Sequence, residues 1–312
     1  MDLRQLRYFT RIVEVGSISA AADVLYTAQP SLSKHVANLE AELGIQLLVR
    51  NASGTQPTPT GQILYRHAKI MLRQLEETRA ALNHGRDVPS GCVSVGLPTS
   101  TARIFAMPLL ARVREQFPEV TIAFVDGSTF DLGQAVISQQ LDMAITTELY
   151  AHSNIQVIPL FEEELFLFGQ QGLMPDASPA SLDELATLPF ILPKFPNSVR
   201  SLLTKLMASA NKELRLVAES SAADIMLAAA RQGLAHTVLP WCALAGGPDI
   251  PAKLSVRSIT GAGLQRQVML CVSNASQNSL AGTVVRQIIL ELIYTLVNER
   301  QWHGVRLTLP AS

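Results

Sequence analysis

The sequence predicts an α+β protein in which a small N-terminal winged helix-turn-helix is joined by a long helix to a two-lobed α/β domain. Three observations support this architecture. Residues 1–45 place apolar side chains at helical spacing around a short turn, and residues 64–82 carry an apolar seam with spacings of four and three. From Cys92 onward, short apolar runs alternate with helical segments, which is typical of a parallel or mixed sheet.

The composition of the whole chain limits its class. Its 312 residues fit two or three compact units, and 48% hydrophobic with 16% charged residues is enough to build buried cores. The formal net charge of −1 neither requires nor excludes nucleic acid as a partner. Residues 1–90 hold ten Lys and Arg against eight Asp and Glu, so the basic surplus there is small and forms no polybasic arm.

The first 45 residues predict three short helices. Ser17 can cap the second helix, a turn follows at residues 26–29, and Pro30 suits the first turn of the third helix. That helix ends at Gly44, and its buried face is formed by Leu32, Val36, Leu39 and Leu43. Small alanines where two helices cross, a turn, and a helix with a polar N-terminal face together predict a helix-turn-helix.

Residues 47–59 predict a wing, in which an apolar strand ends at Arg50 and a second strand returns after a loop. A long helix follows, and its seam consists of Leu64, Ala68, Met71, Leu75, Thr78 and Leu82. A surface helix packed on its own domain would carry the same stripe. Because a helix this long needs a partner, we expect it to dimerise, and we expect it to end at Asn83-His84-Gly85.

The remainder predicts two α/β lobes. The expected strands are residues 92–97, 121–126, 141–146, 165–169, 190–192, 214–218, 236–239 and 267–272. The expected helices are residues 104–117, 132–140, 199–210, 222–232 and 280–299. The chain should cross between the lobes near Leu165 and Gln267, and the acidic run 162–164 should be a solvated strand edge.

These elements define the expected domains. The winged helix-turn-helix should occupy residues 1–60, the dimerisation helix 61–86 and the two-lobed domain 91–312. The first lobe should hold about 91–163 and 268–300, and the second about 164–267.

The third helix, with the turn before it, carries most of the candidate DNA contacts. Gln29 and Asn38 can pair with adenine, and Lys34 can meet guanine or phosphate. In the alternative interpretation the serines cap the helix, Lys34 is only solvated and a lone surface His has no role. Arg50, at the base of the wing, suits a narrow minor groove. The predicted DNA-binding residues are Gln29, Pro30, Ser31, Ser33, Lys34, His35, Asn38 and Arg50.

Hydroxyl and amide side chains follow the predicted strands at the points where a two-lobed α/β domain binds ligands. Any one of them could be an ordinary helix cap, and their convergence is what favours a site. Hydroxyls beside helix N–H groups suit a small organic anion or a polar aromatic acid. The predicted effector-binding residues are Thr99, Ser100, Thr101, Ser128, Thr129, Thr146, Thr147, Asn197, Ser221, His236 and Thr237.

Other classes of function lack their residues. The six His show no metal-ligand spacing, and no phosphate-binding glycine loop or catalytic nucleophile motif occurs, so we expect no catalytic residue, metal or cofactor. We find no signal peptide or transmembrane segment and expect a cytoplasmic protein. The alternatives to a DNA-binding protein controlled by a small-molecule effector are a redox-responsive regulator of the same fold and a non-catalytic small-molecule-binding protein. Cys92, Cys242 and Cys271 lie in apolar contexts, where buried inert thiols are the norm.

The N-terminal stretch closely resembles LysR-type transcriptional regulators. The residues that carry the resemblance are Leu6-Arg7-Tyr8-Phe9, Gly16-Ser17, Ala20-Ala21-Ala22, Leu25, Gln29-Pro30-Ser31-Leu32-Ser33, Leu39-Glu40, Leu43-Gly44, Leu47-Leu48, Arg50 and Thr58-Pro59-Thr60-Gly61. Gly54, Pro57-Thr58, Leu64-Tyr65 and His67-Ala68 further resemble the branch of nitrogen-assimilation control regulators.

The resemblance implies a sequence-specific regulator that binds promoter or operator DNA and is controlled by a small-molecule effector. It implies an effector domain similar to type 2 periplasmic binding proteins, and assembly as a homodimer or homotetramer that activates or represses nearby genes. RNA polymerase is a further candidate partner. One departure concerns the wing, which reads Asn51-Ala52-Ser53-Gly54 where relatives often carry Lys or Arg.

Overall fold

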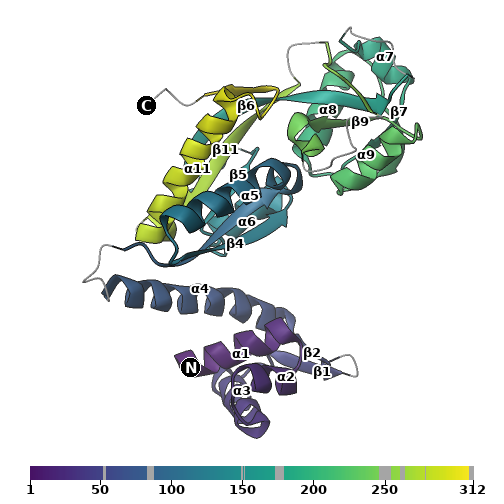
Figure 1. The fold of residues 1–312 in the computed structure, drawn as a ribbon. Coiled ribbons are helices and arrows are strands. Elements are labelled where there is room, and N and C mark those ends of the chain that lie inside the picture. Colours follow the sequence, from purple (N-terminus) through teal and green to yellow (C-terminus); the bar gives the residue numbers. More distant parts are fainter. Residues whose placement is uncertain are drawn as a thin grey trace. The chain divides into compact units, whose positions relative to one another are not determined.

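The computed structural model describes residues 1–51, 54–82, 88–148, 150, 152–172, 179–245, 254–260, 264–277 and 279–308. The chain forms two compact units, Met1–Asp87 and Val88–Ser312 (Figure 1). The helix-turn-helix, the wing and the long helix belong to the first unit. The alternating strands and helices belong to the second.

The first unit begins with three short helices, as the sequence predicts. Its elements are α1 (Leu3–Val15), α2 (Ile18–Val24), α3 (Gln29–Leu43), β1 (Leu48–Asn51), β2 (Gly54–Pro57) and α4 (Pro59–Leu82). The Ser17 side chain accepts a hydrogen bond from the backbone N–H of Ala20, which confirms the predicted cap. Gly44 ends α3 in the left-handed conformation with φ 67°, as predicted. The core between the helices includes Phe9, Ile12 and Ala21, none of which is exposed.

The wing is a two-stranded antiparallel ribbon in which Arg50 on β1 pairs with Thr55 on β2. It docks on the end of α1, because the Thr55 N–H donates to the carbonyl of Gly16 over 2.8 Å. A Cβ at Gly54 would lie 2.6 Å from that carbonyl oxygen, so only glycine permits the approach. The predicted wing is therefore confirmed, although its tip, Ala52-Ser53, lies outside the described residues.

The first turns of α4 pack on their own domain. Leu64 and Tyr65 join the helix-turn-helix core, and Ala68 is fully buried. Lys69 Nζ lies 2.7 Å from Glu14 Oε1 on α1. Burial alone would raise the pKa of Glu14, but Lys69 and Arg11 together lower it. Two of the six predicted seam residues, Leu64 and Ala68, are thus used within the domain.

The second half of α4 leaves apolar surface exposed. Met71 in this half is 36% exposed. The predicted end of the helix at Asn83-His84-Gly85 lies outside the described residues. This half of the helix is where the dimerisation prediction still applies.

The second unit alternates strands and helices. Its elements are β3 (Gly91–Pro98), α5 (Thr99–Gln116), β4 (Val120–Gly127), α6 (Thr129–Ile137), β5 (Met143–Thr146), β6 (Ile155–Gln170), α7 (Leu182–Thr187), β7 (Pro189–Leu192), α8 (Ser198–Ser209), β8 (Arg215–Glu219), α9 (Ala223–Arg231), β9 (Thr237–Pro240), η1 (Trp241–Leu244), β10 (Leu254–Arg257), β11 (Gln265–Ser273), α10 (Asn274–Gln277), α11 (Leu280–Asn298) and β12 (Val305–Leu307).

One long sheet joins the two lobes. Its strand order is β10-β6-β11-β5-β3-β4, with β9 and β12 also paired to β6, and β7 pairs with β8 in a separate parallel sheet. In Figure 1, β6 runs from the lobe that contains α5, α6 and α11 into the lobe that contains α7, α8 and α9. The predicted crossing near Leu165 and Gln267 is therefore made by two antiparallel strands, β6 and β11.

Strand β6 is much longer than the predicted strand 165–169, because it begins at Ile155. Two features of the sequence conceal its first half. Pro159 sits at a register shift opposite Val268 and Met269, where a bulge tolerates the missing N–H. The acidic run that follows suggests solvent exposure.

That acidic run is not a solvated edge, so the sequence-based interpretation of residues 162–164 was wrong for its central member. Glu163 is 1% exposed and faces Arg266 of β11, which is 8% exposed. Arg266 Nε and Nη2 donate to Glu163 Oε2 over 2.9 and 2.7 Å. Trp302 Nε1 donates to Glu163 Oε1 over 3.3 Å, so both carboxylate oxygens are bonded. Burial is possible because the charge is neutralised and hydrogen-bonded.

Separate apolar cores lie in the two lobes. The first is built around Phe105, Phe161 and Trp302 and is covered by α11. In the described part of the chain, α11 is the one helix long and apolar enough to cross a membrane, but Val285, Ile289 and other residues on one of its faces are buried in this core. In the second lobe, α8 and α9 pack on cores that include Phe190 and Phe168.

We predict that Arg266→Met destabilises the second unit by about 3–5 kcal/mol, because it leaves the Glu163 carboxylate buried without a counter-charge. Both tryptophans of the chain, Trp241 and Trp302, lie in this unit, so their fluorescence during urea unfolding follows its stability.

Arg306→Met is the matched control. It removes the partner of the neighbouring Glu162, but Arg306 is 77% exposed, so the expected loss is below about 1 kcal/mol. Equal losses of stability in the two variants would show that the buried ion pair contributes no more than the exposed one.

Candidate nucleic-acid interface and effector cleft

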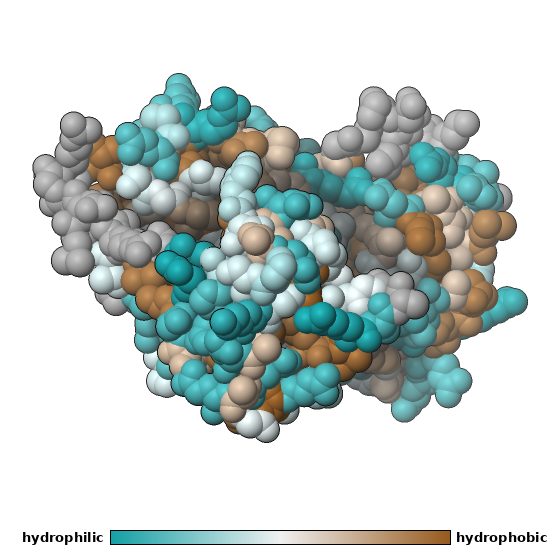
Figure 2. All heavy atoms as spheres, turned by 90° about the horizontal axis from the view of Figure 1, so that it is seen from below, coloured by the Kyte–Doolittle hydropathy of each residue, from teal (hydrophilic) through white to brown (hydrophobic). Residues whose placement is uncertain are grey.

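The exposed face of α3 carries most of the predicted DNA contacts. Five of the eight predicted residues lie on the solvent side of this helix, namely Gln29, Pro30, Ser31, Lys34 and Asn38. The opposite face, with Leu32, Val36 and Leu39, is buried in the helix-turn-helix core. Figure 2 views the molecule from below, and the face of the N-terminal unit seen there is mostly hydrophilic.

The first turn of α3 has no capping side chain. Its N-cap residue is Ala28, which makes no side-chain hydrogen bond, so the first backbone N–H groups have no protein side chain to satisfy them. Ser31 and Ser33 therefore do not cap this helix. Instead, Gln29 Nε2 donates to Ser33 Oγ over 2.9 Å, which holds the Gln29 side chain along the helix.

His35 lies at the edge of this surface. It is half-buried, and its ring meets the ring of Tyr8 on α1 edge to face, with 5.2 Å between centroids. This contact holds His35 toward α1 and away from the most exposed line of α3.

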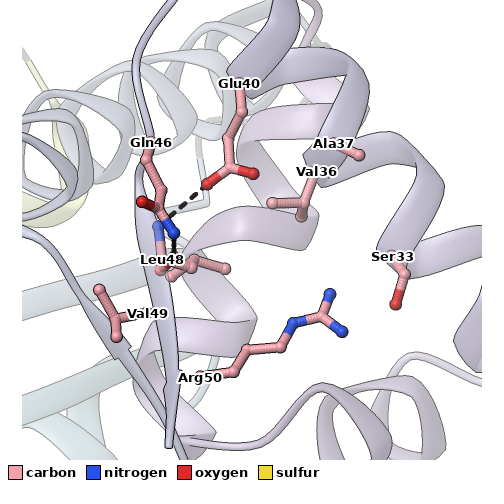
Figure 3. A pocket seen from close by; sticks show the side chains of 8 residues that line it. All are labelled: Ser33, Val36, Ala37, Glu40, Gln46, Leu48, Val49 and Arg50. Atoms are coloured by element: carbon pink, nitrogen blue, oxygen red, sulfur yellow. Dashed lines mark hydrogen bonds between the residues drawn. The ribbon is translucent and has the colours of Figure 1, made fainter.

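A groove separates α3 from the wing strand β1 (Figure 3). It is a cavity of about 320 Å³ lined by Ser33, Val36, Ala37, Glu40, Gln46, Leu48, Val49 and Arg50. Figure 3 shows the Arg50 side chain extending from β1 across the groove, toward the side of α3 that carries Ser33. The groove thus has a cationic group and a hydroxyl near its mouth.

Glu40 fixes the width of this groove. Its Oε1 atom accepts hydrogen bonds from the backbone N–H groups of Leu47 and Leu48 over 2.7 and 3.1 Å. Gln46 Nε2 donates to the carbonyl of Leu48 over 3.0 Å. These bonds tie the start of the wing to α3, so Arg50 lies at a set distance from that helix.

In the first lobe of the second unit, three predicted effector residues come together. Thr147 Oγ1 donates to Thr129 Oγ1 over 3.2 Å, and Ser128 caps α6 by accepting from the N–H of Asp131. The Tyr150 hydroxyl covers this end of α6, lying 2.7 Å from Glu148 Oε2 and 3.2 Å from the Thr129 carbonyl. Burial and the Glu148 carboxylate raise the pKa of Tyr150, so its phenol stays protonated.

The other first-lobe candidates differ in access. Thr99-Ser100-Thr101 lie between the predicted strand 92–97 and the predicted helix 104–117, and in the structure they form the first turn of α5. Thr99 is exposed, whereas Thr101 is 3% exposed. Thr146 is fully buried, with its Oγ1 3.4 Å from Cys271 Sγ.

The second-lobe candidates separate into two groups. Asn197 caps α8 by accepting from the N–H of Val199 over 3.0 Å, and Ser221 is exposed just before α9. His236 and Thr237 lie at the other end of the lobe. The His236 N–H donates to the carbonyl of Pro189, the first residue of β7, whereas Asn197 comes after Leu192, the last residue of β7. The structure therefore does not bring His236 and Thr237 together with the others.

Burial lowers the pKa of His236, so its ring is neutral near pH 7. Its Nδ1 atom and the hydroxyl of the fully buried Thr237 have no hydrogen-bond partner in the described part of the protein.

A buried polar chain that the sequence did not predict links the helix starts of both lobes. Arg266 Nη1 donates to Ser198 Oγ at the start of α8 over 3.2 Å, while Glu163 Oε1 accepts from Cys242 Sγ over 3.5 Å. Ser100, in the first turn of α5, also bonds to Cys242. The sequence carried only a weak signal for these buried polar contacts, since only the pairing of β6 with β11 brings Glu163 and Arg266 together.

A second tie also spans the lobes. Arg103 of α5 forms an ion pair with Asp224 of α9, and its Nη1 atom donates to the carbonyl of Ala245 over 3.5 Å. The two lobes are therefore linked by two separate sets of polar contacts.

The cysteines occupy two kinds of environment. Burial, with the nearby Glu163 carboxylate, raises the pKa of the Cys242 thiol well above its ordinary value, and burial also raises the pKa of Cys271. Cys92 is exposed, so the prediction that all three thiols are buried was wrong at this position. No cluster of His, Cys, Asp and Glu that could hold a metal occurs within the described residues.

Comparisons with known proteins agree with this arrangement. Residues 3–62 match the bacterial regulatory helix-turn-helix of the lysR family, and residues 86–293 match the LysR substrate binding domain. The nitrogen assimilation regulatory protein nac of Klebsiella aerogenes is 34% identical over 302 residues, which cover 94% of this chain and 95% of that protein. The nac protein of Escherichia coli is 33% identical, with 98% and 100% covered.

Solved structures share the fold. Full-length CbnR in complex with its target DNA matches with a TM-score of 0.68 and 21% identity, over 95% of this chain and 99% of that chain. A variant of full-length OxyR from Pseudomonas aeruginosa matches with a TM-score of 0.73 and 19% identity, over 100% and 99%. The chain therefore belongs to the LysR family: it is a DNA-binding transcriptional regulator with an N-terminal helix-turn-helix and a C-terminal effector-binding domain.

Proposed function

We propose that this regulator recognises its operator with the exposed face of α3, placed in the major groove. The observation that carries the proposal is the set of exposed polar side chains, Gln29, Lys34 and Asn38, on a helix whose other face is buried. Gln and Asn can pair with adenine, and Lys can reach guanine or phosphate. The uncapped N–H groups at the start of α3 suit a backbone phosphate.

The groove between α3 and β1 suits the DNA strand that separates the major from the minor groove. Arg50 reaches across this groove, and Ser33 lies on its other side. In this proposal Arg50 binds the sugar-phosphate strand at the edge of the minor groove, and the wing beyond it enters that groove. The wing contributes few cationic side chains of its own.

We propose that the protein acts as a homodimer, or as a homotetramer built from dimers. Helix α4 has 24 residues, which span about 36 Å. Its first turns pack on α1, so the exposed Met71 and the half-buried Leu75 beyond them suit a second copy of α4.

In this proposal the protein works in the cytoplasm, where its DNA and RNA polymerase are found. Its likeness to the nac proteins favours nitrogen-assimilation genes as its targets.

We propose that the effector is a small organic anion bound between the lobes. Thr99, Ser100, Thr147 and Ser221 are accessible or half-buried, and helix α5 begins at Thr99 while helix α9 begins just after Ser221. A ligand can act only by binding one arrangement of the lobes better than another. The Arg103–Asp224 pair would be the contact that such a change makes or breaks.

The first test is selection of genomic fragments by the purified protein, with affinity measured against salt. We expect an interrupted dyad and a steep loss of affinity as salt rises. Asn38→Ala should relax the sequence preference by about 1–3 kcal/mol at one position, since it removes a base contact. If Lys34 contacts phosphate, Lys34→Ala should weaken binding to all DNA sequences equally. The dependence of log affinity on log salt concentration should then have a slope smaller by about 1 per bound subunit.

Lys205→Ala is the control, because Lys205 is an exposed lysine on α8, in the effector domain. Unchanged binding by both α3 variants would rule out the placement of α3 in the major groove.

For the effector, a panel of small aliphatic and aromatic carboxylates should include a ligand that changes operator binding. Thr147→Val should weaken the binding of that ligand about tenfold, because it removes one buried hydrogen bond. The DNA affinity measured without the ligand should be unchanged. Thr204→Val, at an exposed site on α8, is the control. A ligand response that survives Thr147→Val would place the effector elsewhere.

The redox alternative is weakened by the burial of Cys242 and Cys271, whose raised pKa values disfavour the reactive thiolate. We predict that an aromatic disulfide reagent titrates one thiol rapidly in the native protein and three after denaturation. Peroxide should leave operator binding unchanged. Fast, reversible loss of two thiols together with altered DNA binding would instead support a redox sensor.

A further inference from the structure

The turn between α2 and α3 holds an aromatic residue in an unfavourable backbone conformation. Tyr26 has a φ of 49°, in the left-handed region. It follows the last residue of α2 and its C-cap, and the Thr27 N–H donates to the carbonyl of Ala22 over 3.0 Å. This is the motif that ends many helices, and its left-handed position is normally Gly or Asn, because a Cβ is strained there.

The Tyr26 side chain gains nothing from the fold in return. It is 98% exposed, whereas Leu234, also among the exposed large apolar residues, is 66% exposed. Within the described residues, no hydrogen bond or ring contact holds the phenol. Both the backbone and the side chain of Tyr26 are therefore unfavourable in the isolated protein, and such positions tend to be functional.

The position of Tyr26 relative to α3 indicates its partner. It lies three residues before Gln29, where α3 begins. If the start of α3 enters the major groove, the turn that leads into it lies at the rim of that groove, where a sugar-phosphate strand passes. Tyrosine is one of the side chains that bind phosphate oxygens in protein–DNA complexes.

We propose that Tyr26 contacts the DNA backbone beside the recognition helix. Its hydroxyl donates a hydrogen bond to a phosphate oxygen, and its ring packs on the adjacent deoxyribose. This inference rests on the proposed placement of α3 in the major groove. Because a phosphate contact carries no base information, Tyr26 positions α3 and leaves the sequence preference to Gln29, Lys34 and Asn38.

Tyr26→Gly tests the proposal, because it should change stability and DNA binding in opposite directions. Relief of the left-handed strain should raise the melting temperature of the N-terminal unit by about 2–6 °C in calorimetry of the full chain. Operator affinity should nevertheless fall by about 3–10-fold, with the salt slope and the preference over nonspecific DNA unchanged. Tyr26→Phe should show part of this loss, since it removes only the hydroxyl.

Two controls separate the possible failures. Arg300→Gly relieves a similar φ of 57° in the effector domain and should leave DNA affinity unchanged. Asn38→Ala tests the placement of α3 without involving Tyr26. If Asn38→Ala relaxes the sequence preference while Tyr26→Gly binds the operator within twofold of wild type, the Tyr26 proposal is overturned and the α3 placement stands.

If, in addition, Tyr26→Gly impairs transcription in vitro with normal operator affinity, the ring meets a protein such as RNA polymerase, which also overturns the proposal. Normal sequence preference in both variants would overturn the placement of α3 together with the inference drawn from it.

Discussion

The buried ion pair between Glu163 and Arg266 is the interaction on which the effector domain depends. It joins β6 to β11, the two strands that pass between the lobes, and its hydrogen bonds reach the start of α8 through Ser198 and the Trp302 indole in the first core. A buried pair of this kind adds little stability compared with apolar residues, but losing one partner is severe. Because Glu163 and Arg266 lie opposite each other in the observed register of β6 and β11, the pair favours that register over shifted ones.

The DNA-binding unit is likewise held together by a small number of polar contacts. One carboxylate, Glu40, binds two backbone N–H groups at the start of the wing, and Glu14 binds Lys69 on α4. These bonds fix the wing and the long helix relative to α3 and α1. In contrast, two features of the surface proposed to meet DNA lack such support: the first turn of α3 has no side-chain cap, and Tyr26 is exposed and strained. Surfaces prepared for a ligand often show such unsatisfied features.

Sequence reasoning recovered most elements but not the contacts between them. Helical periodicity, Ser17 and Gly44 predicted the helix-turn-helix because those signals are local. The first half of β6 was missed because Pro159 and the acidic run look like breakers until β11 pairs with them, and the burial of Glu163 depends on Arg266, about a hundred positions away. For the same reason, His236 was grouped with the cleft although its strand places it at the opposite end of the lobe.

The packing of α4 on α1 has a consequence for how operators of this regulator could diverge. Because Glu14, Tyr65 and Ala68 hold the start of α4 against the helix-turn-helix, the direction of α3 is set by the direction of α4. In a dimer, the separation of the two recognition helices then depends on how the two long helices meet. Substitutions on the exposed side of α4, such as at Met71, would alter the spacing of half-sites while the bases read in each half-site stayed the same. Spacing and sequence preference can therefore evolve independently.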